Sequence, residues 1–280
     1  MYWQTANFRI DLSQPRLMGI VNVTPDSFSD GGAHATSRLA LRHAEQLLKE
    51  GAEILDIGGE STRPGAPEVP LDEELGRVVP VVREAVKLGV PVSVDTYKPE
   101  VMRAVLDLGA DIINDIWAFR RPGAEAAVAS HPSCGICAMH MHKDPQTMQM
   151  APMEGNVVAD VAVFLQQRAQ ALEGQGIDSS RIALDPGVGF GKTVEQNFSL
   201  LASQAQFVAL GYPLLVGWSR KSSLGAVTGI QEPERRVTAS VAAALLAVER
   251  GAHVIRVHDV KATAEALAVF LAVRTIDRSH

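Results

Sequence analysis

The sequence predicts an α/β protein that folds as a single (β/α)8 TIM barrel. Eight short apolar segments recur along the 280 residues, and segments with helical periodicity separate them. Barrels of this type need roughly 250 residues, so the length suits one domain over residues 1–280. The same alternation also allows an open, doubly wound sheet, which is the main alternative.

The expected strands are short apolar runs, and a Gly-Ala pair that would end the preceding helix comes before several of them. They are expected near residues 17–22, 53–57, 92–95, 111–115, 136–140, 181–185, 214–218 and 253–257. Helices are expected over 157–172, 234–250 and 263–274, where apolar side chains recur at helical spacing. Phe8, Ile10 and Leu12 alternate with polar residues, which predicts a short N-terminal β-hairpin or strand covering the bottom of the barrel.

The composition narrows the class of protein. A 46% hydrophobic content and a net charge of −6 argue against disorder and against a general nucleic-acid binder. No apolar run of about 18 residues is present, so no membrane association is expected. Two cysteines cannot form a disulfide framework, and the first residues do not resemble a signal peptide. We therefore expect a cytoplasmic protein.

Polar residues follow nearly every expected strand. In a barrel, the carboxyl ends of the strands converge, so these side chains should form one site. A single such residue would more often cap the next helix, but a ring of them favours a binding site. The ring comprises Asn22, Asp56, Asp95, Asn114, Asp115, His140, Asp185, Ser219, Arg220, Lys221, Arg256, His258 and Asp259.

Two long polar loops follow the first two expected strands, at residues 22–32 and 58–66. Long polar loops in a compact domain are usually binding loops, and Phe28 is expected to cover an apolar ligand. Basic side chains cluster at the other end of the ring and could hold a diphosphate, unless some of them only pair with strand-end acids. They are Arg63, Arg220, Lys221, Arg256 and His258.

Three short motifs resemble known binding or catalytic motifs but are better explained by a structural role. Residues 186–193 resemble a phosphate-binding loop, but proline stands where its first glycine is required. Residues 217–221 lack the second glycine of a nucleophile elbow. Cys134 and Cys137 have metal-ligand spacing, yet they lie on an expected buried strand, which favours packed thiols.

Seven stretches, in order, resemble the dihydropteroate synthases among the pterin-binding enzymes. They are residues 22–32, 58–65, 93–96, 114–116, 185–187, 189–192 and 219–222, and the resemblance spans residues 18–259. It implies a (β/α)8 barrel that joins 4-aminobenzoate to (7,8-dihydropterin-6-yl)methyl diphosphate in folate biosynthesis. It also implies inhibition by sulfonamides and a homodimer formed through the outer helices.

The resemblance also assigns roles to individual residues. It implies a pterin set of Asp95, Asn114, Asp185 and Lys221, and a diphosphate set of Thr62, Arg63, Arg256 and His258, with Asn22 for Mg²⁺. It implies an aminobenzoate site formed by Phe28, Thr62, Pro64, Lys221 and Ser222. Asp95, Lys221, Arg256 and His258 are then the catalytic candidates. Tyr97, Val188 and Trp218 depart from the residues frequent in the family.

Three alternatives remain on the residues alone. A pterin-binding methyltransferase domain serving a cobalamin partner would keep Asp95, Asn114 and Asp185 but would not need the diphosphate cluster. A Schiff-base lyase would use Lys221, which requires a desolvated lysine at a strand end. A non-catalytic paralogue would bind pterin only.

Overall fold

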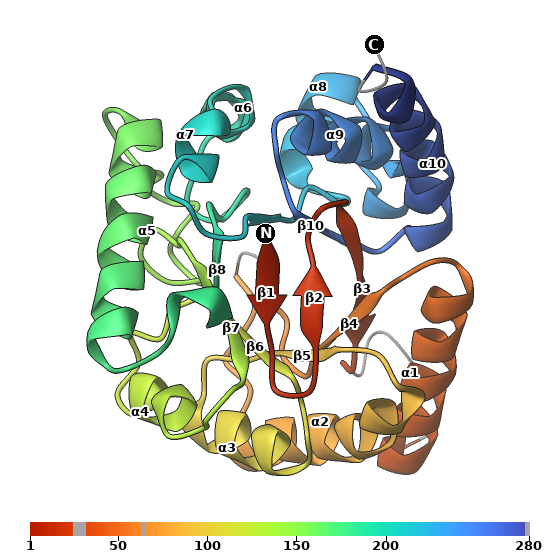
Figure 1. The fold of residues 1–280 in the computed structure, drawn as a ribbon, viewed down its shortest axis with the longest axis vertical. Helices are drawn as coiled ribbons and strands as arrows, with labels where there is room; N and C mark the ends of the chain where they lie inside the picture. The colour runs from red at the N-terminus through yellow and green to blue at the C-terminus, as the bar shows by residue number, and fades with distance from the viewer. Residues whose placement is uncertain (25–31, 63–64, 278–280) are drawn as a thin grey trace.

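In a computed structural model, which describes residues 1–24, 32–62 and 65–277, the strands form a nearly closed parallel barrel surrounded by helices (Figure 1). The sheet runs in the order β8-β7-β6-β5-β4-β3-β10-β9, and a bridge between Leu184 and Leu214 joins its two ends. The predicted barrel is therefore confirmed, and the open sheet is wrong. The strands are β3 (Arg16–Asn22), β4 (Ile54–Gly58), β5 (Val92–Asp95), β6 (Ile112–Asp115), β7 (Gly135–Met139), β8 (Ile182–Asp185), β9 (Leu215–Val216) and β10 (Val254–Val257).

The helices alternate with these strands and cover the outside of the barrel. Gly51, Gly109 and Gly251 end helical segments with φ of 108°, 97° and 91°, which explains the recurring Gly-Ala pair. The α-helices are α1 (Gly32–Lys49), α2 (Leu71–Ala85), α3 (Pro99–Asp107), α4 (Ala124–Ala129), α5 (Val157–Gly174), α6 (Val194–Ala202), α7 (Ala205–Val208), α8 (Ser222–Thr228), α9 (Val237–Glu249) and α10 (Val260–Asp277). Among the described residues, short 3₁₀ turns also occur at η2 (Val86–Leu88), η3 (Ser179–Arg181) and η4 (Pro233–Arg235).

Several expected boundaries differ from the structure, and those of two helices differ most. The helix expected from residue 234 begins as α9 at Val237, because η4 and Arg236 come first. The Arg236 guanidinium donates to the carbonyls of Ile230 and Arg220, so this segment anchors loops instead of extending the helix. The helix expected over 263–274 is longer at both ends and runs as α10.

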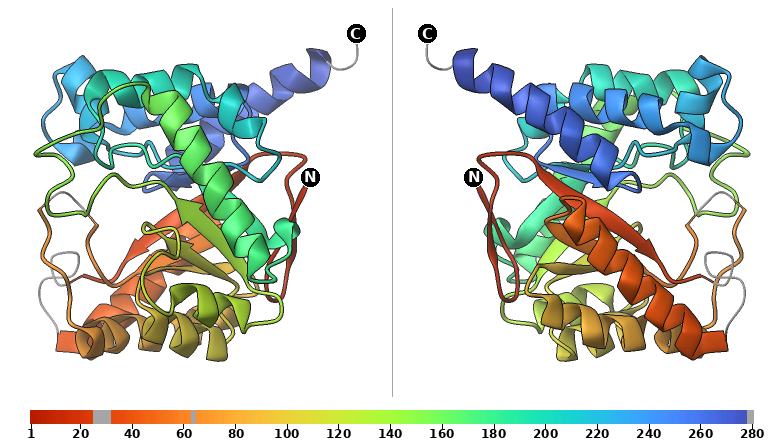
Figure 2. Two further views of the ribbon diagram at one scale, coloured as in Figure 1. Left: turned by 90° about the vertical axis from the view of Figure 1, so that its left-hand side faces the viewer. Right: turned by 90° about the vertical axis from the view of Figure 1, so that its right-hand side faces the viewer.

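The N-terminal residues form the expected hairpin, β1 (Tyr2–Gln4) paired with β2 (Arg9–Asp11), at the end of the barrel opposite the loops that follow the strands (Figure 2). Its side chains close the barrel with an apolar cluster. Trp3 is fully buried there and donates from Nε1 to the carbonyl of Arg181 at 2.9 Å. The cluster contains Trp3, Ile10, Leu12, Met18, Ile54, Ile112, Cys137, Ala183, Leu215 and Val254.

In the part of the chain that the structure describes, no helix is both long and apolar enough to cross a membrane.

Candidate active site

The strand alternation places polar side chains directly above the apolar floor. Successive side chains of a strand point to opposite faces, so residues two apart share the barrel interior. Ile112 on β6 lies in the floor cluster, and Asn114 follows two residues later. Ala183 and Asp185 on β8 repeat this spacing. Asp95, Asn114 and Asp185 of the predicted pterin set therefore lie at the carboxyl ends of their strands, and Lys221 lies directly before α8.

Arg256 is the centre of this group. Its Nε donates to Asp56 Oδ2 at 2.5 Å, and its Nη2 donates to Asp95 Oδ2 at 2.8 Å. Asp95 in turn pairs in register with Asn114 on the neighbouring strand. Burial disfavours the charged guanidinium, but the two carboxylates more than compensate and raise the pKa of Arg256. One cation from β10 thus bonds to side chains of β4 and β5, which are not its neighbours in the sheet.

Asp185 lies at the end of β8, and its carboxylate is held by a tight turn. Its Oδ1 accepts from the backbone N–H of Gly187 at 2.7 Å. Gly187 has a φ of 66°, and a Cβ there would lie 1.8 Å from the carbonyl oxygen of His140, so only glycine fits. Burial raises the pKa of Asp185 to about 6, while the Gly187 N–H and nearby Lys221 oppose the rise. The carboxylate can accept donors from a ligand.

Two further groups at the mouth titrate near neutrality. Burial raises the pKa of Asp95 to about 7, although Arg256 opposes the rise. Burial lowers the pKa of Lys221 to about 8, although the Asp185 charge acts against it. The Lys221 ammonium lies 4.4 Å from the centre of the Phe190 ring. The mouth therefore contains acids and a base whose charges depend on what binds there.

The other predicted residues occupy the rim. His258 follows β10, and its backbone N–H and Nδ1 lie 3.1 and 3.0 Å from the Ser219 hydroxyl. Asn22 ends β3 and is half-buried, as is Thr62, whereas Ser222 is exposed at the first residue of α8. The predictions for Phe28, Arg63 and Pro64 lie outside the described residues.

Several members of the expected ring serve neighbouring loops instead. Arg220, expected in the diphosphate cluster, makes two hydrogen bonds to Asp259, at 3.0 and 2.7 Å, so the pairing alternative holds for it. Asp115 accepts from the backbone N–H groups of residues 117 and 119. His140 contacts the buried Lys192 ammonium at 2.9 Å, and burial lowers the pKa of His140 to about 2. Asp56, which was expected at the end of a strand, is instead the third of the five residues of β4.

Sequence reasoning missed a buried cluster that secures the second loop. Lys98 forms ion pairs with Glu60, at the start of that loop, and with Glu74 on α2. The Tyr97 hydroxyl donates to Glu60 Oε1 at 2.6 Å, and Thr96 donates to Glu74 at 2.7 Å. Tyr97, noted as a family departure, thus helps to hold the loop that carries Thr62. The only available signal was a glutamate within a polar glycine-rich segment.

The two cysteines separate into different environments. Cys137 lies in the floor cluster, and Cys134 packs in the outer core beside the Arg181 guanidinium. Both are buried free thiols, which agrees with the expectation of packed thiols.

A (β/α)8 barrel with two buried carboxylates, an amide, a lysine and an arginine at its mouth is a barrel enzyme suited to a polar heterocycle that carries an anion. Residues 18–258 match the family described as "Pterin binding enzyme". The chain belongs to this family, and within it to the dihydropteroate synthases, which are transferases.

Similar proteins agree in sequence and in structure. Dihydropteroate synthase of Neisseria meningitidis serogroup C is 52% identical over 268 residues, covering 95% of each chain. The Burkholderia cenocepacia enzyme complexed with 7,8-dihydropteroate is 52% identical with a TM-score of 0.91, covering 100% of this chain and 98% of that one. The Yersinia pestis enzyme with a sulfonamide drug is 45% identical with a TM-score of 0.93, covering 98% and 100%.

Proposed function

We propose that the barrel mouth joins 4-aminobenzoate to (7,8-dihydropterin-6-yl)methyl diphosphate, which releases diphosphate and yields 7,8-dihydropteroate. The observation that carries this proposal is Arg256 bridging Asp56 and Asp95 at the same mouth as Asn114 and Asp185. The similarity to the Burkholderia enzyme with bound 7,8-dihydropteroate supports it. The methyltransferase alternative would not require the cationic residues.

The pterin ring presents an N–H beside an exocyclic amino group. A carboxylate can accept both donors in parallel, and the buried Asp185 suits this role. Asn114 can donate and accept on the remaining ring edge, and Lys221 can donate to the ring carbonyl. A ring held by these three groups would direct its methylene toward Asp95.

The reaction breaks the bond between the methylene carbon and the diphosphate oxygen. The electron pair leaves with diphosphate, whose charge Arg256 and His258 neutralise. The pterin-conjugated cation that remains is stabilised by the Asp95 carboxylate. The aryl amine nitrogen of 4-aminobenzoate then bonds to the methylene and loses a proton to water. Since this amine is neutral at pH 7, it needs no strong general base.

Mg²⁺ fits this site as a partner of the diphosphate. Within residues 1–24, 32–62 and 65–277, no group of three His, Cys, Asp or Glu could hold a metal ion. Mg²⁺ commonly takes only one or two protein oxygens together with substrate phosphates, and the Asn22 amide oxygen suits such a role. When bound, it would neutralise phosphate charge. We expect EDTA to abolish turnover and added Mg²⁺ to restore it.

The aminobenzoate site would lie between the two long loops and the start of α8. Thr62, Lys221 and Ser222 would border it, and Phe28 and Pro64, the other residues proposed for it, lie outside the described residues. Sulfonamides resemble 4-aminobenzoate, so we expect their apparent inhibition constant to rise in proportion to 4-aminobenzoate concentration. An inhibition constant independent of 4-aminobenzoate would contradict a shared site.

The decisive experiment is chromatographic detection of dihydropteroate from the pterin diphosphate and 4-aminobenzoate. The matched control replaces the diphosphate ester with the free hydroxymethyl pterin, which has no leaving group. Product from the diphosphate alone supports the proposal. Absence of product with Mg²⁺ present refutes it. Borohydride trapping tests the Schiff-base alternative, since only that chemistry would attach a substrate to Lys221.

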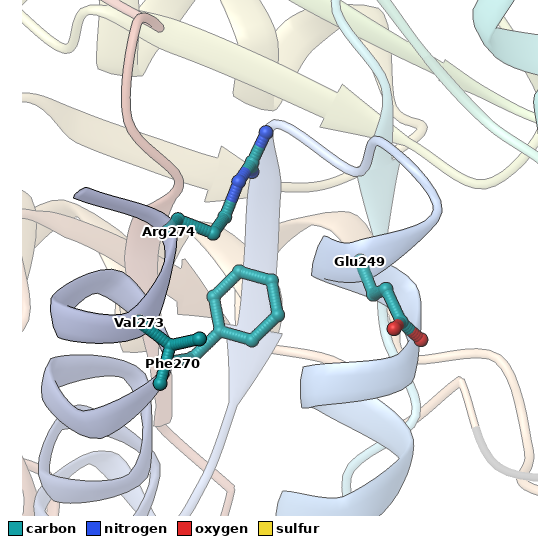
Figure 3. Close-up of a pocket in the computed structure, with 4 residues that line it drawn as sticks. All are labelled: Glu249, Phe270, Val273 and Arg274. Carbon is teal, nitrogen blue, oxygen red and sulfur yellow. The ribbon is translucent and has the colours of Figure 1, made fainter. Parts of the chain in front are cut away.

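We further propose that the enzyme is a homodimer formed through α9 and α10. This outer face exposes Leu246, Val269, Val273 and Ile276. It also contains a hollow of about 400 Å³ lined by Glu249, Phe270, Val273 and Arg274 (Figure 3). Clustered exposed apolar residues favour an interface.

The dimer can be tested by analytical ultracentrifugation. We expect V273E to give monomers, because it places a charge in the apolar face. V163E is the matched control, since Val163 is also exposed but lies on α5. Dimers that persist in V273E, or that are absent from the wild type, would refute this interface.

The state of the thiols supports a proposal for the compartment. Cys134 and Cys137 are both unpaired, and reduced thiols are typical of the cytoplasm. We propose that the enzyme works there.

A further inference from the structure

Asp56 lies beneath the mouth, where it cannot touch the substrate. It is the third residue of β4, and its side chain is 0% exposed, compared with 10% for Asp95 and 21% for Arg256. A substrate can contact only the surface that the mouth exposes, so Asp95 and Arg256 are reachable and Asp56 is not.

One oxygen of Asp56 holds two residues of the proposed substrate site. Asp56 Oδ2 accepts from Arg256 Nε at 2.5 Å and from Asn114 Nδ2 at 3.3 Å. These donors come from β10 and β6, so the contact ties together side chains from different parts of the barrel. With its Nδ2 directed at Asp56, the Asn114 amide keeps Oδ1 for another donor.

Burial of the Asp56 carboxylate costs folding free energy. Asp56 Oδ1 is buried and has no hydrogen-bond partner among the described residues. A buried acceptor left unpaired destabilises the folded state. The floor cluster just below is apolar, and apolar side chains in place of both Asp56 and Arg256 would avoid this cost, whereas removal of Asp56 alone would leave the buried guanidinium with one partner fewer. Stability alone therefore gives no reason for a buried Asp56–Arg256 pair.

Resting on the proposed function, we infer that Asp56 is a positioning residue. It holds the Arg256 guanidinium and the Asn114 amide in the orientations that bind the diphosphate and the pterin, without contacting either.

Asp56 also contributes to the charge balance at Asp95. The groups that face Asp95 are Arg256 on β10, Asp56 on β4, Asp115 on β6, Glu74 on α2 and Lys221 before α8. Arg256 lowers the pKa of Asp95, and the carboxylates raise it. Neutralising Asp56 removes one negative charge near Asp95. Asp95 then becomes the remaining carboxylate that pairs with Arg256, so both changes lower the pKa of Asp95.

The test compares D56N with two controls. Asparagine keeps the shape of Asp56 and removes its charge. S93A alters the residue paired in register with Asp56, whose hydroxyl is likewise buried and without a hydrogen-bond partner among the described residues. D111N neutralises another buried carboxylate, which bonds the backbone of Val92 away from the mouth.

For D56N we expect kcat/KM for the pterin diphosphate to fall about 10- to 100-fold, as expected for a weakened charged hydrogen bond. S93A should stay within about twofold of wild type. A carbon-13 NMR titration should show the Asp95 midpoint at lower pH in D56N and unmoved in D111N. Circular dichroism checks folding, and D56S replaces D56N if the latter does not fold.

Wild-type kinetics together with a wild-type Asp95 midpoint in the Asp56 variant would overturn the inference. So would an equal loss of kcat/KM in S93A, because the effect would then be a general packing defect. These outcomes are distinct from a failure of the proposed function, in which the wild type itself forms no dihydropteroate. The NMR titration needs no substrate and tests the coupling of Asp56 to Asp95 independently.

Discussion

The two ends of the barrel interior are built from the same strands but have opposite chemistry. On β4, Ile54 lies in the floor cluster and Asp56 lies two residues closer to the mouth. On β6, Ile112 and Asn114 follow the same order. Apolar burial stabilises the fold, whereas buried charge opposes it unless it is paired. A single strand can therefore provide stability at one end and reactivity at the other.

The floor should control stability with little influence on the site. We expect W3A to lower the free energy of unfolding by about 3–5 kcal/mol, because it empties a fully buried aromatic position. It also removes the hydrogen bond to the Arg181 carbonyl. Urea denaturation measures the loss, and substrate KM values measured under folding conditions should remain near those of the wild type.

The control for this prediction is Y2A, which removes an exposed ring from the same hairpin. Its effect on unfolding should be small. A large change in KM for W3A in fully folded protein would show that the two ends are coupled, contrary to the comparison.

The mouth should behave in the opposite way. We expect D185N to weaken pterin binding by about 1.5–3 kcal/mol, because the amide loses the charge and one of the two parallel acceptors. Isothermal titration calorimetry with hydroxymethyl pterin measures the loss. Equal affinity of the wild type and D185N would remove Asp185 from the pterin site. D178N, in an exposed turn before η3, is the control that should leave binding unchanged.

The sequence was sufficient for the barrel because the strands were distinct apolar runs and segments with helical periodicity separated them. It also located Asp95, Asn114, Asp185 and Arg256, since their positions follow from where strands end. It did not separate Arg220 from Arg256, because both were expected in the same cluster of basic residues after strands. The two arginines differ in their partners. Arg220 pairs with Asp259, whereas Arg256 pairs with Asp56 and Asp95. Such pairings are set by three-dimensional proximity, which a linear pattern does not encode.

A pH–rate profile tests the contrast between the mouth and the floor without a substitution. Burial raises the pKa of Asp95 to about 7 and that of Asp185 to about 6. Asp185 must be ionised to accept both pterin donors, and Asp95 must be ionised to stabilise the cation. We therefore expect kcat/KM for the pterin diphosphate to rise with pH through about 6 to 7, whereas ordinary carboxyl groups titrate near pH 4.

Stability should change in the reverse direction over the same interval. Since both carboxyl groups have higher pKa values in the folded state, they favour folding when protonated. This contribution is complete below the unfolded pKa of about 4 and is lost as pH rises through 6 and 7. Urea midpoints measured beside the pH-rate profile should reveal the opposition, and D185N should reduce the stability change. An acid limb near pH 4, with no opposing stability change, would mean that the two carboxylates are not held at the mouth in this way.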